Sequence, residues 1–128
     1  MFDRIETLRM ANSLTAHAAE RQKLIARNVA NADTPGFRAR DLASFTKTYH
    51  TQGAVEMRAS RPRHLTGASW GGSPRVIDDK GEPAPNGNSV SLEDEMIRSA
   101  EARREFDLAL AVTKSSLNLI RTSLGRRG

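Results

Sequence analysis

A long run of regularly spaced residues near the C-terminus is the feature that most constrains how this chain can fold. From Ser91 onward, selected positions alternate spacings of four and three residues for more than four heptads, which is the pattern of one side of a coiled-coil helix. Ser91 is placed to cap the start of this helix, and acidic residues follow in its first turn. The sequence therefore predicts one helix of about 34 residues. The positions of this C-terminal seam are Leu92, Met96, Ser99, Arg103, Phe106, Leu110, Thr113, Leu117, Ile120 and Leu124.

The same alternation near the N-terminus predicts a second helix, from Ile5 to about Ala30. Many positions of this N-terminal seam are small or polar, so the helix suits close packing against neighbours better than standing alone in water. The positions are Leu8, Ala11, Thr15, Ala18, Gln22, Ile25, Val29 and Ala32.

Between the two helices the pattern weakens and is then lost. An amphipathic pattern could continue briefly over residues 38–48, through Leu42 and Phe45. From Thr51 to Ser89 there is no period, and glycine and proline are frequent. We expect a flexible loop there, with a short strand or hairpin around residues 75–78.

The expected fold class is mainly α, with long N- and C-terminal helices that pack as an antiparallel or coiled-coil-like pair. The chain divides into an N-terminal helix (1–32), a turn motif and loop-rich middle (33–90) and a C-terminal helix (91–128), and both ends form one assembly domain. A single pair of helices cannot bury both seams completely. We therefore expect the missing burial to come from neighbouring subunits, so that ordering is coupled to assembly.

The composition argues against an enclosed active site, since Leu, Ile, Val and Phe together make up only 25 of 128 residues. The chain has no cysteine, and His17, His50 and His64 lack the spacing of metal ligands. It has neither a phosphate-binding glycine loop nor the motif of a serine nucleophile. We predict no enzymatic activity, no cofactor and no metal site. We also expect no secretory signal peptide and no membrane-spanning segment.

The formal net charge of +5 leaves two other functional classes open. Arginines at positions 58, 61 and 63 and at the C-terminus suggest a basic helical protein that binds nucleic acid, although Tyr49 and Trp70 are too few aromatics for a base-stacking platform. A salt-dependent gel shift would reveal such binding. The heptads alone would also fit a cytoplasmic coiled-coil adaptor or export chaperone, but that class has no need of a rigid turn after the first helix.

Residues 26–39 read ARNVANADTPGFRA. Pro35 disfavours a helical conformation at Thr34, and Pro35 with Gly36 can form the centre of a type II turn. The segment resembles the signature of bacterial flagellar rod and hook proteins, in which a helix ends in A-N-x-x-T-x-G followed by Phe or Tyr. The residues at this turn motif are Ala30, Asn31, Thr34, Pro35, Gly36 and Phe37.

Residues 85–96 also look like the start of the C-terminal helix in proximal-rod members of that family, and the short length of the chain agrees. One departure is that Ala102 and Phe106 stand where many relatives are expected to have Asn and Tyr. This departure puts one lattice hydrogen bond in doubt and leaves the resemblance intact.

The resemblance implies a structural, non-enzymatic subunit of the flagellar basal body. Such proteins leave the cytoplasm unfolded through the flagellar type III export apparatus, without a cleavable signal peptide, and polymerise into a rod that crosses the periplasm and carries torque from the membrane ring to the hook. The implied partners are other copies, other rod proteins, the membrane-ring protein and its rod adaptor, and the export apparatus. Nucleic-acid binding and membrane insertion are not implied. The residues expected to make assembly contacts are Leu8, Ile25, Val29, Leu92, Met96, Phe106, Leu110, Leu117, Ile120 and Leu124.

Overall fold

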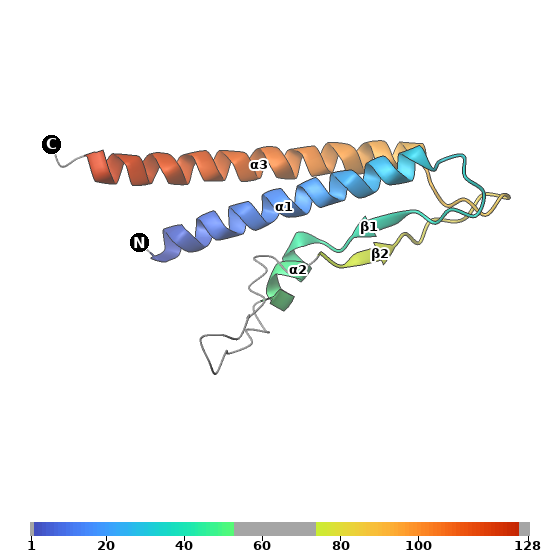
Figure 1. Cartoon of the computed structure of the whole chain (residues 1–128), viewed down its shortest axis with the longest axis horizontal. Helices are drawn as coiled ribbons and strands as arrows, with labels where there is room; N and C mark the ends of the chain where they lie inside the picture. Colours follow the sequence, from blue (N-terminus) through green and yellow to red (C-terminus); the bar gives the residue numbers. More distant parts are fainter. Residues whose placement is uncertain (1, 53–73, 126–128) are drawn as a thin grey trace, which may run out of the picture.

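Two long helices dominate the structure, a computed structural model that describes residues 2–52 and 74–125. Helix α1 (Phe2–Ala30) and helix α3 (Leu92–Gly125) run antiparallel, and α1 lies between α3 and a small strand pair (Figure 1). The first turns of α1 and the last turns of α3 lie at one end of the molecule, where the two helices spread apart (Figure 1). The expected mainly α fold with paired terminal helices is confirmed.

Both helices form where the sequence predicts them. Helix α3 spans 34 residues and begins directly after Ser91, whose Oγ accepts a hydrogen bond from the backbone N–H of Asp94 at 3.4 Å. Three acidic residues occupy its first turn, where the positive end of the helix dipole favours negative charge. Helix α1 ends at the predicted Ala30 and begins three residues before the predicted Ile5.

The contact between the two helices is made by small residues. On α1, Ala11, Ala18 and Ile25 are buried at heptad spacing, and these positions belong to the predicted N-terminal seam. The buried residues on α3 are also seven apart, but they form a line that the sequence analysis did not identify. They are Glu95, Ala102, Ala109 and Ser116. Small side chains allow two helix backbones to approach closely, so α1 covers this line and leaves most leucines of α3 outside the contact.

The short strands β1 (Arg40–Leu42) and β2 (Val76–Asp78) pair antiparallel, with Asp41 opposite Ile77. The strand predicted at residues 75–78 is confirmed. The amphipathic pattern expected over residues 38–48 is wrong at its start, because residues 40–42 are a strand, and right further on, where helix α2 (Phe45–Gln52) forms. The cause of the difference is the partner strand, which comes from more than thirty residues away and gives no local signal.

The segment predicted as a flexible loop is held firmly over residues 84–89. The backbone N–H of Gly87 donates to the carbonyl of Ala84 at 2.8 Å, and the N–H of Ser89 donates to the carbonyl of Phe37 at 3.0 Å. Ser89 and its neighbour Asn88 are buried. This part is a loop, as predicted, and its hydrogen bonds give it a defined conformation. Residues 53–73, which include Trp70, His64 and the arginines at positions 58, 61 and 63, lie outside the described residues.

Candidate assembly surface and the turn junction that positions it

The turn that ends α1 has the predicted geometry. The N–H of Phe37 donates to the carbonyl of Thr34 at 3.3 Å, and Gly36 has a φ of +72°, as the third residue of a type II turn requires. The side-chain nitrogen of Asn31 donates to the carbonyl of Arg27 at 2.8 Å. Oδ1 of Asn31 accepts a hydrogen bond from the Thr34 hydroxyl at 3.2 Å. The motif residues therefore fix the direction in which the chain leaves the helix.

A second turn packs directly against the first. The N–H of Gly36 donates to the carbonyl of Asn86 at 3.0 Å, and Gly87 has a φ of +80°. A Cβ atom added to Gly87 would lie 3.3 Å from the Cα of Gly36, so a larger residue at position 87 would press on the backbone of the first turn. The two glycines thus allow the turn after α1 and the turn before α3 to meet.

Asn88 joins the end of α1 to the start of α3. Its side-chain nitrogen lies 2.9 Å from the carbonyl oxygen of Asn31 and 2.8 Å from those of Ala32 and Thr34. Its Oδ1 accepts a hydrogen bond from the N–H of Val90 at 2.8 Å. These carbonyls belong to the turn that follows α1, and Asn88 reaches them from 54 to 57 residues away in the sequence. The sequence analysis noted this residue only as part of a polar turn.

Asn28 ties three elements together from inside α1. It is 1% exposed, and its Oδ1 accepts from the N–H of Arg40 at 3.2 Å while its Nδ2 donates to the carbonyl of Arg40 at 2.8 Å. The same Nδ2 lies 3.0 Å from Oε1 of Glu95 on α3. Asn28 thus ties both β1 and α3 to α1. Sequence reasoning missed it, although it stands within the quoted motif segment.

Charged side chains fill the space beside these amides. Arg21 of α1 pairs with Asp41 of β1 at 3.1 Å and with Glu101 of α3 at 3.2 Å. Arg98 of α3 pairs with Asp79 at 2.8 Å and lies 3.8 Å from Asp41. Burial alone would lower the pKa of both guanidinium groups, but the surrounding carboxylates, led by Asp41 at Arg21 and by Asp79 at Arg98, outweigh it and raise both pKa values. Both guanidinium groups therefore stay charged and bridge α3 to the strand pair.

Glu95 is the most deeply buried member of this network. It is 1% exposed, and its Oε1 accepts hydrogen bonds from Asn28 and from Arg98, both at 3.0 Å. Burial raises the pKa of Glu95, and the bonds from Asn28 and Arg98 offset only part of that rise. Oε2 has no hydrogen-bond partner in the described part of the chain. The molecule thus places a polar network where a self-sufficient domain would place its largest apolar side chains.

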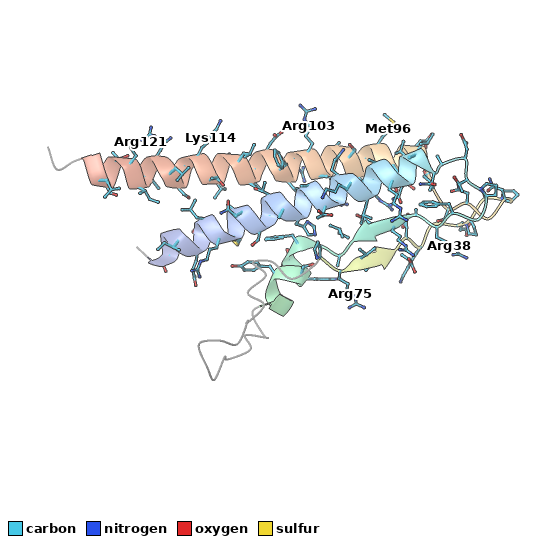
Figure 2. All side chains as sticks on the ribbon, in the orientation of Figure 1. Arg38, Arg75, Met96, Arg103, Lys114 and Arg121 are labelled. Atoms are coloured by element: carbon cyan, nitrogen blue, oxygen red, sulfur yellow. The ribbon has the colours of Figure 1, made fainter. Side chains whose placement is uncertain are left out.

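The predicted assembly residues are divided between the inside and the surface. Ile25 is buried, and Leu8, Phe106 and Ile120 are half-buried. The remaining residues are at least 40% exposed. They are Val29 on α1 and Leu92, Met96, Leu110, Leu117 and Leu124 on α3. Met96 projects from the edge of α3 opposite α1 (Figure 2).

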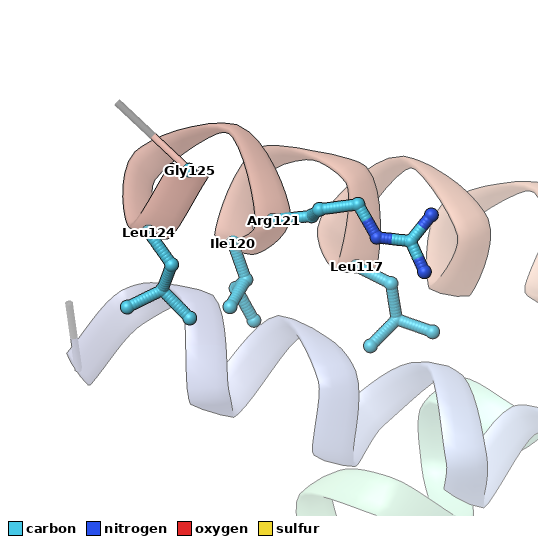
Figure 3. A pocket seen from close by; sticks show the side chains of 5 residues that line it. All are labelled: Leu117, Ile120, Arg121, Leu124 and Gly125. Carbon is cyan, nitrogen blue, oxygen red and sulfur yellow. The ribbon is translucent and has the colours of Figure 1, made fainter. Parts of the chain in front are cut away.

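An open groove of about 530 Å³ lies at the end of α3 where the two helices spread apart. Leu117, Ile120 and Leu124 project from α3 toward the first turns of α1, with Arg121 beside them (Figure 3). Leu124 is 73% exposed and Leu117 is 54% exposed. The fold of one chain therefore leaves apolar side chains uncovered at this end.

Residues 2–52 and 74–125 hold no group of three or more His, Cys, Asp or Glu side chains placed to bind a metal ion. Across those same residues, every helix is too short or too polar to span a bilayer. What the arrangement can do is fix the relative positions of α1, α3 and the strand pair while presenting apolar side chains outward.

Comparison with known proteins identifies the family of this chain. Residues 8–38, which cover most of α1 and the turn after it, match the family model for flagella basal body rod proteins. The chain is 32% identical to flagellar basal body rod protein FlgB of Agrobacterium fabrum, over 87% of both chains. The chain belongs to the FlgB family of flagellar basal body rod proteins.

FlgB of Salmonella typhimurium is also 32% identical, over 91% of this chain and 92% of the relative. FlgB of Escherichia coli K12 is 28% identical over the same shares. Both matches cover about nine tenths of the chain. The chain therefore has the structural role of a rod component, and its place is the flagellar basal body.

Proposed function

We propose that this FlgB-family chain polymerises through α1 and α3 as a subunit of the proximal rod, and that the rod carries torque between the membrane ring and the hook. The other subunits in contact with it are copies of the same chain, other rod proteins, and the membrane-ring protein with its rod adaptor. The rod lies in the periplasm. The chain reaches it unfolded through the flagellar type III export apparatus, without a cleavable signal peptide.

The exposed apolar side chains of α3 are the observation that carries this proposal. Leu92, Met96, Leu110, Leu117 and Leu124 are between 40% and 73% exposed, and a fully buried side chain of this size contributes about 1.5–3 kcal/mol. A polymer contact that covers the exposed part of each would gain about 1 kcal/mol per side chain. A monomer leaves this stabilisation unused.

The polar network supports the torque-bearing part of the proposal. A subunit that transmits torque must resist a change in the angle between its helices and the segments attached to them. Arg21 and Asn28 each bond to both β1 and α3, and Arg98 of α3 bonds to Asp79 directly after β2, all at 3.2 Å or less. Such bonds oppose rotation of α3 against the strand pair more than sliding apolar contacts would.

The substitution Leu117→Asp tests the proposal in a motile strain. We expect the variant to be exported but absent from purified basal bodies, and the cells to be non-motile, because a carboxylate on the apolar stripe would have to be desolvated in the polymer. Asn118→Asp is the matched control, since it adds the same charge at the next, exposed position. Normal swimming of the Leu117→Asp strain, or motile cells with intact hooks after deletion of the gene, would overturn the proposal.

A further inference from the structure

Helix α3 carries two separate apolar stripes, and only one of them belongs to the predicted seam. The first flank consists of Leu92, Met96, Leu110, Leu117 and Leu124. The second flank consists of Ile97, Leu108 and Leu119, which are 60%, 58% and 52% exposed. In the described part of the chain, every side chain of the two flanks is at least 40% exposed. A helix with one partner needs one apolar stripe, so the second flank needs its own explanation.

The two flanks lie on nearly opposite sides of the helix. At about 100° per residue, the buried line through Ala102 and Ala109 defines the direction of α1. The first flank is then centred about 90° to one side of that direction, and the second flank about 110° to the other. A single neighbouring helix cannot touch both, because they are separated by about 160° across the outer face. Two neighbours are required.

The charges beside the flanks have opposite signs. Arg103, Lys114 and Arg121 project together with Met96 along the edge of α3 opposite α1 (Figure 2). Helical spacing places these cations beside the first flank and acids beside the second. The acids are Asp94, Glu101 and Glu105. Toward the outer face, each flank is also bordered by one residue of the other sign. Asp107 lies beside the otherwise basic first flank, and Arg104 lies beside the otherwise acidic second flank. Glu101 and Glu105 share one cation, Arg21, within the chain, so the second flank keeps its acidic character.

We propose that the first flank of α3 docks on the second flank of α3 in the next copy of the chain. The proposal rests on the polymerisation proposed above and names the surfaces that carry it. A symmetric contact of two first flanks would bring cations against cations and would leave both second flanks uncovered. A contact of unlike flanks pairs opposite charges and covers both stripes. Because its two sides differ, it continues from copy to copy and closes only if the rotation allows.

The absence of cysteine makes this pairing directly testable by crosslinking. Leu117→Cys places a thiol on the first flank and Leu108→Cys places one on the second. The two variants carry different epitope tags, are co-expressed in motile cells, and are treated in isolated basal bodies with a short, flexible bis-maleimide. Ala111→Cys is the control, because position 111 is exposed on the outer face between the flanks. Lys114→Cys and Ser115→Cys are a second pair, at exposed polar positions beside the two flanks.

We expect a crosslinked product that carries both tags when Leu117→Cys and Leu108→Cys are co-expressed. We expect no such product when either variant is co-expressed with Ala111→Cys, and no crosslinked dimer when either variant is present alone. The pair Lys114→Cys and Ser115→Cys should give the same result. A crosslinked dimer from Leu117→Cys alone would show a symmetric contact and overturn the proposal. Basal bodies that contain both variants but give no two-tag product would overturn the flank pairing alone. Basal bodies that lack the unmodified chain would overturn the proposed function.

Discussion

Replacing Asn88 by alanine should destabilise the fold by an amount that its contacts allow to be estimated. The side chain is 4% exposed, and its amide donates to carbonyls of the turn after α1 and accepts from the N–H of Val90. An amide nitrogen has two hydrogens, so two donated bonds and one accepted bond are lost in full. At about 0.5–1.5 kcal/mol each, with a further cost for buried groups left unpaired, we expect a loss of about 3 kcal/mol.

Urea denaturation followed by circular dichroism at the helix band measures this loss. For a small protein the slope of unfolding free energy is about 1–3 kcal/mol per molar urea, so the midpoint should fall by at least about 1 M. Asn86→Ala is the matched control in the same turn. Asn86 is exposed, and among the described residues its side chain makes one bond, from the N–H of Asn88 at 3.1 Å, so its removal should cost about 1 kcal/mol or less.

Asn88→Asp separates hydrogen bonding from packing. Aspartate has nearly the same shape as asparagine but offers oxygen in place of the donor nitrogen, so it would face the three carbonyl oxygens with no hydrogen to share. We expect Asn88→Asp to destabilise the chain at least as much as Asn88→Ala. If the aspartate variant unfolds at the wild-type midpoint, or if Asn88→Ala falls within about 0.5 kcal/mol of Asn86→Ala, the role assigned to Asn88 is refuted.

Two further predictions concern the inner face of α3. Burial raises the pKa of Glu95 in the folded chain above its ordinary value of 4.5. The folded chain therefore gains stability from the protonated carboxyl, fully at pH values below 4.5, and loses this gain as the pH rises through the raised pKa. Urea titrations should show the stability of wild type relative to Glu95→Gln falling as the pH rises above the ordinary glutamate pKa of 4.5, and a constant difference would contradict the burial effect. Ala109→Leu should cost about 1–3 kcal/mol in thermal unfolding, because Ala109 is 0% exposed against α1 and a larger side chain forces the helices apart. Ala111→Leu on the outer face is its control, and an equal cost for both would disprove close packing at position 109.

The elements that the sequence predicts correctly are those encoded by neighbouring residues. Ser91 and the acidic turn after it locate the start of α3, and the heptad spacing runs unbroken to its end. Pro35 and Gly36 specify a turn within four residues. In each case the physical cause and its effect lie within one or two helical turns, so no knowledge of the rest of the chain is required.

The elements that the sequence does not predict depend on distant partners. Residues 40–42 form a strand because Asn28 pairs with the backbone of Arg40 and because β2 lies alongside. Asn88 finds its carbonyls 54 to 57 residues away. Asparagine is common in turns for local reasons, and nothing in its immediate surroundings distinguishes one that closes a junction from one that faces water.

The inner line of α3 was missed for a different reason, and that reason bears on how the protein works. Two heptad patterns overlap on one helix, and hydrophobicity favours the one with leucines over the one that contains Ala102, Ala109 and Ser116. The isolated chain buries the smaller set, because small residues and polar bonds can fix the angle of α3 without using its large apolar side chains. Changes inside, such as Asn88→Ala, should then alter the unfolding of one chain. Changes on the flanks, such as Leu117→Asp, should affect that unfolding much less and act mainly on assembly, since a side chain that is more than half exposed in the monomer has little to lose there.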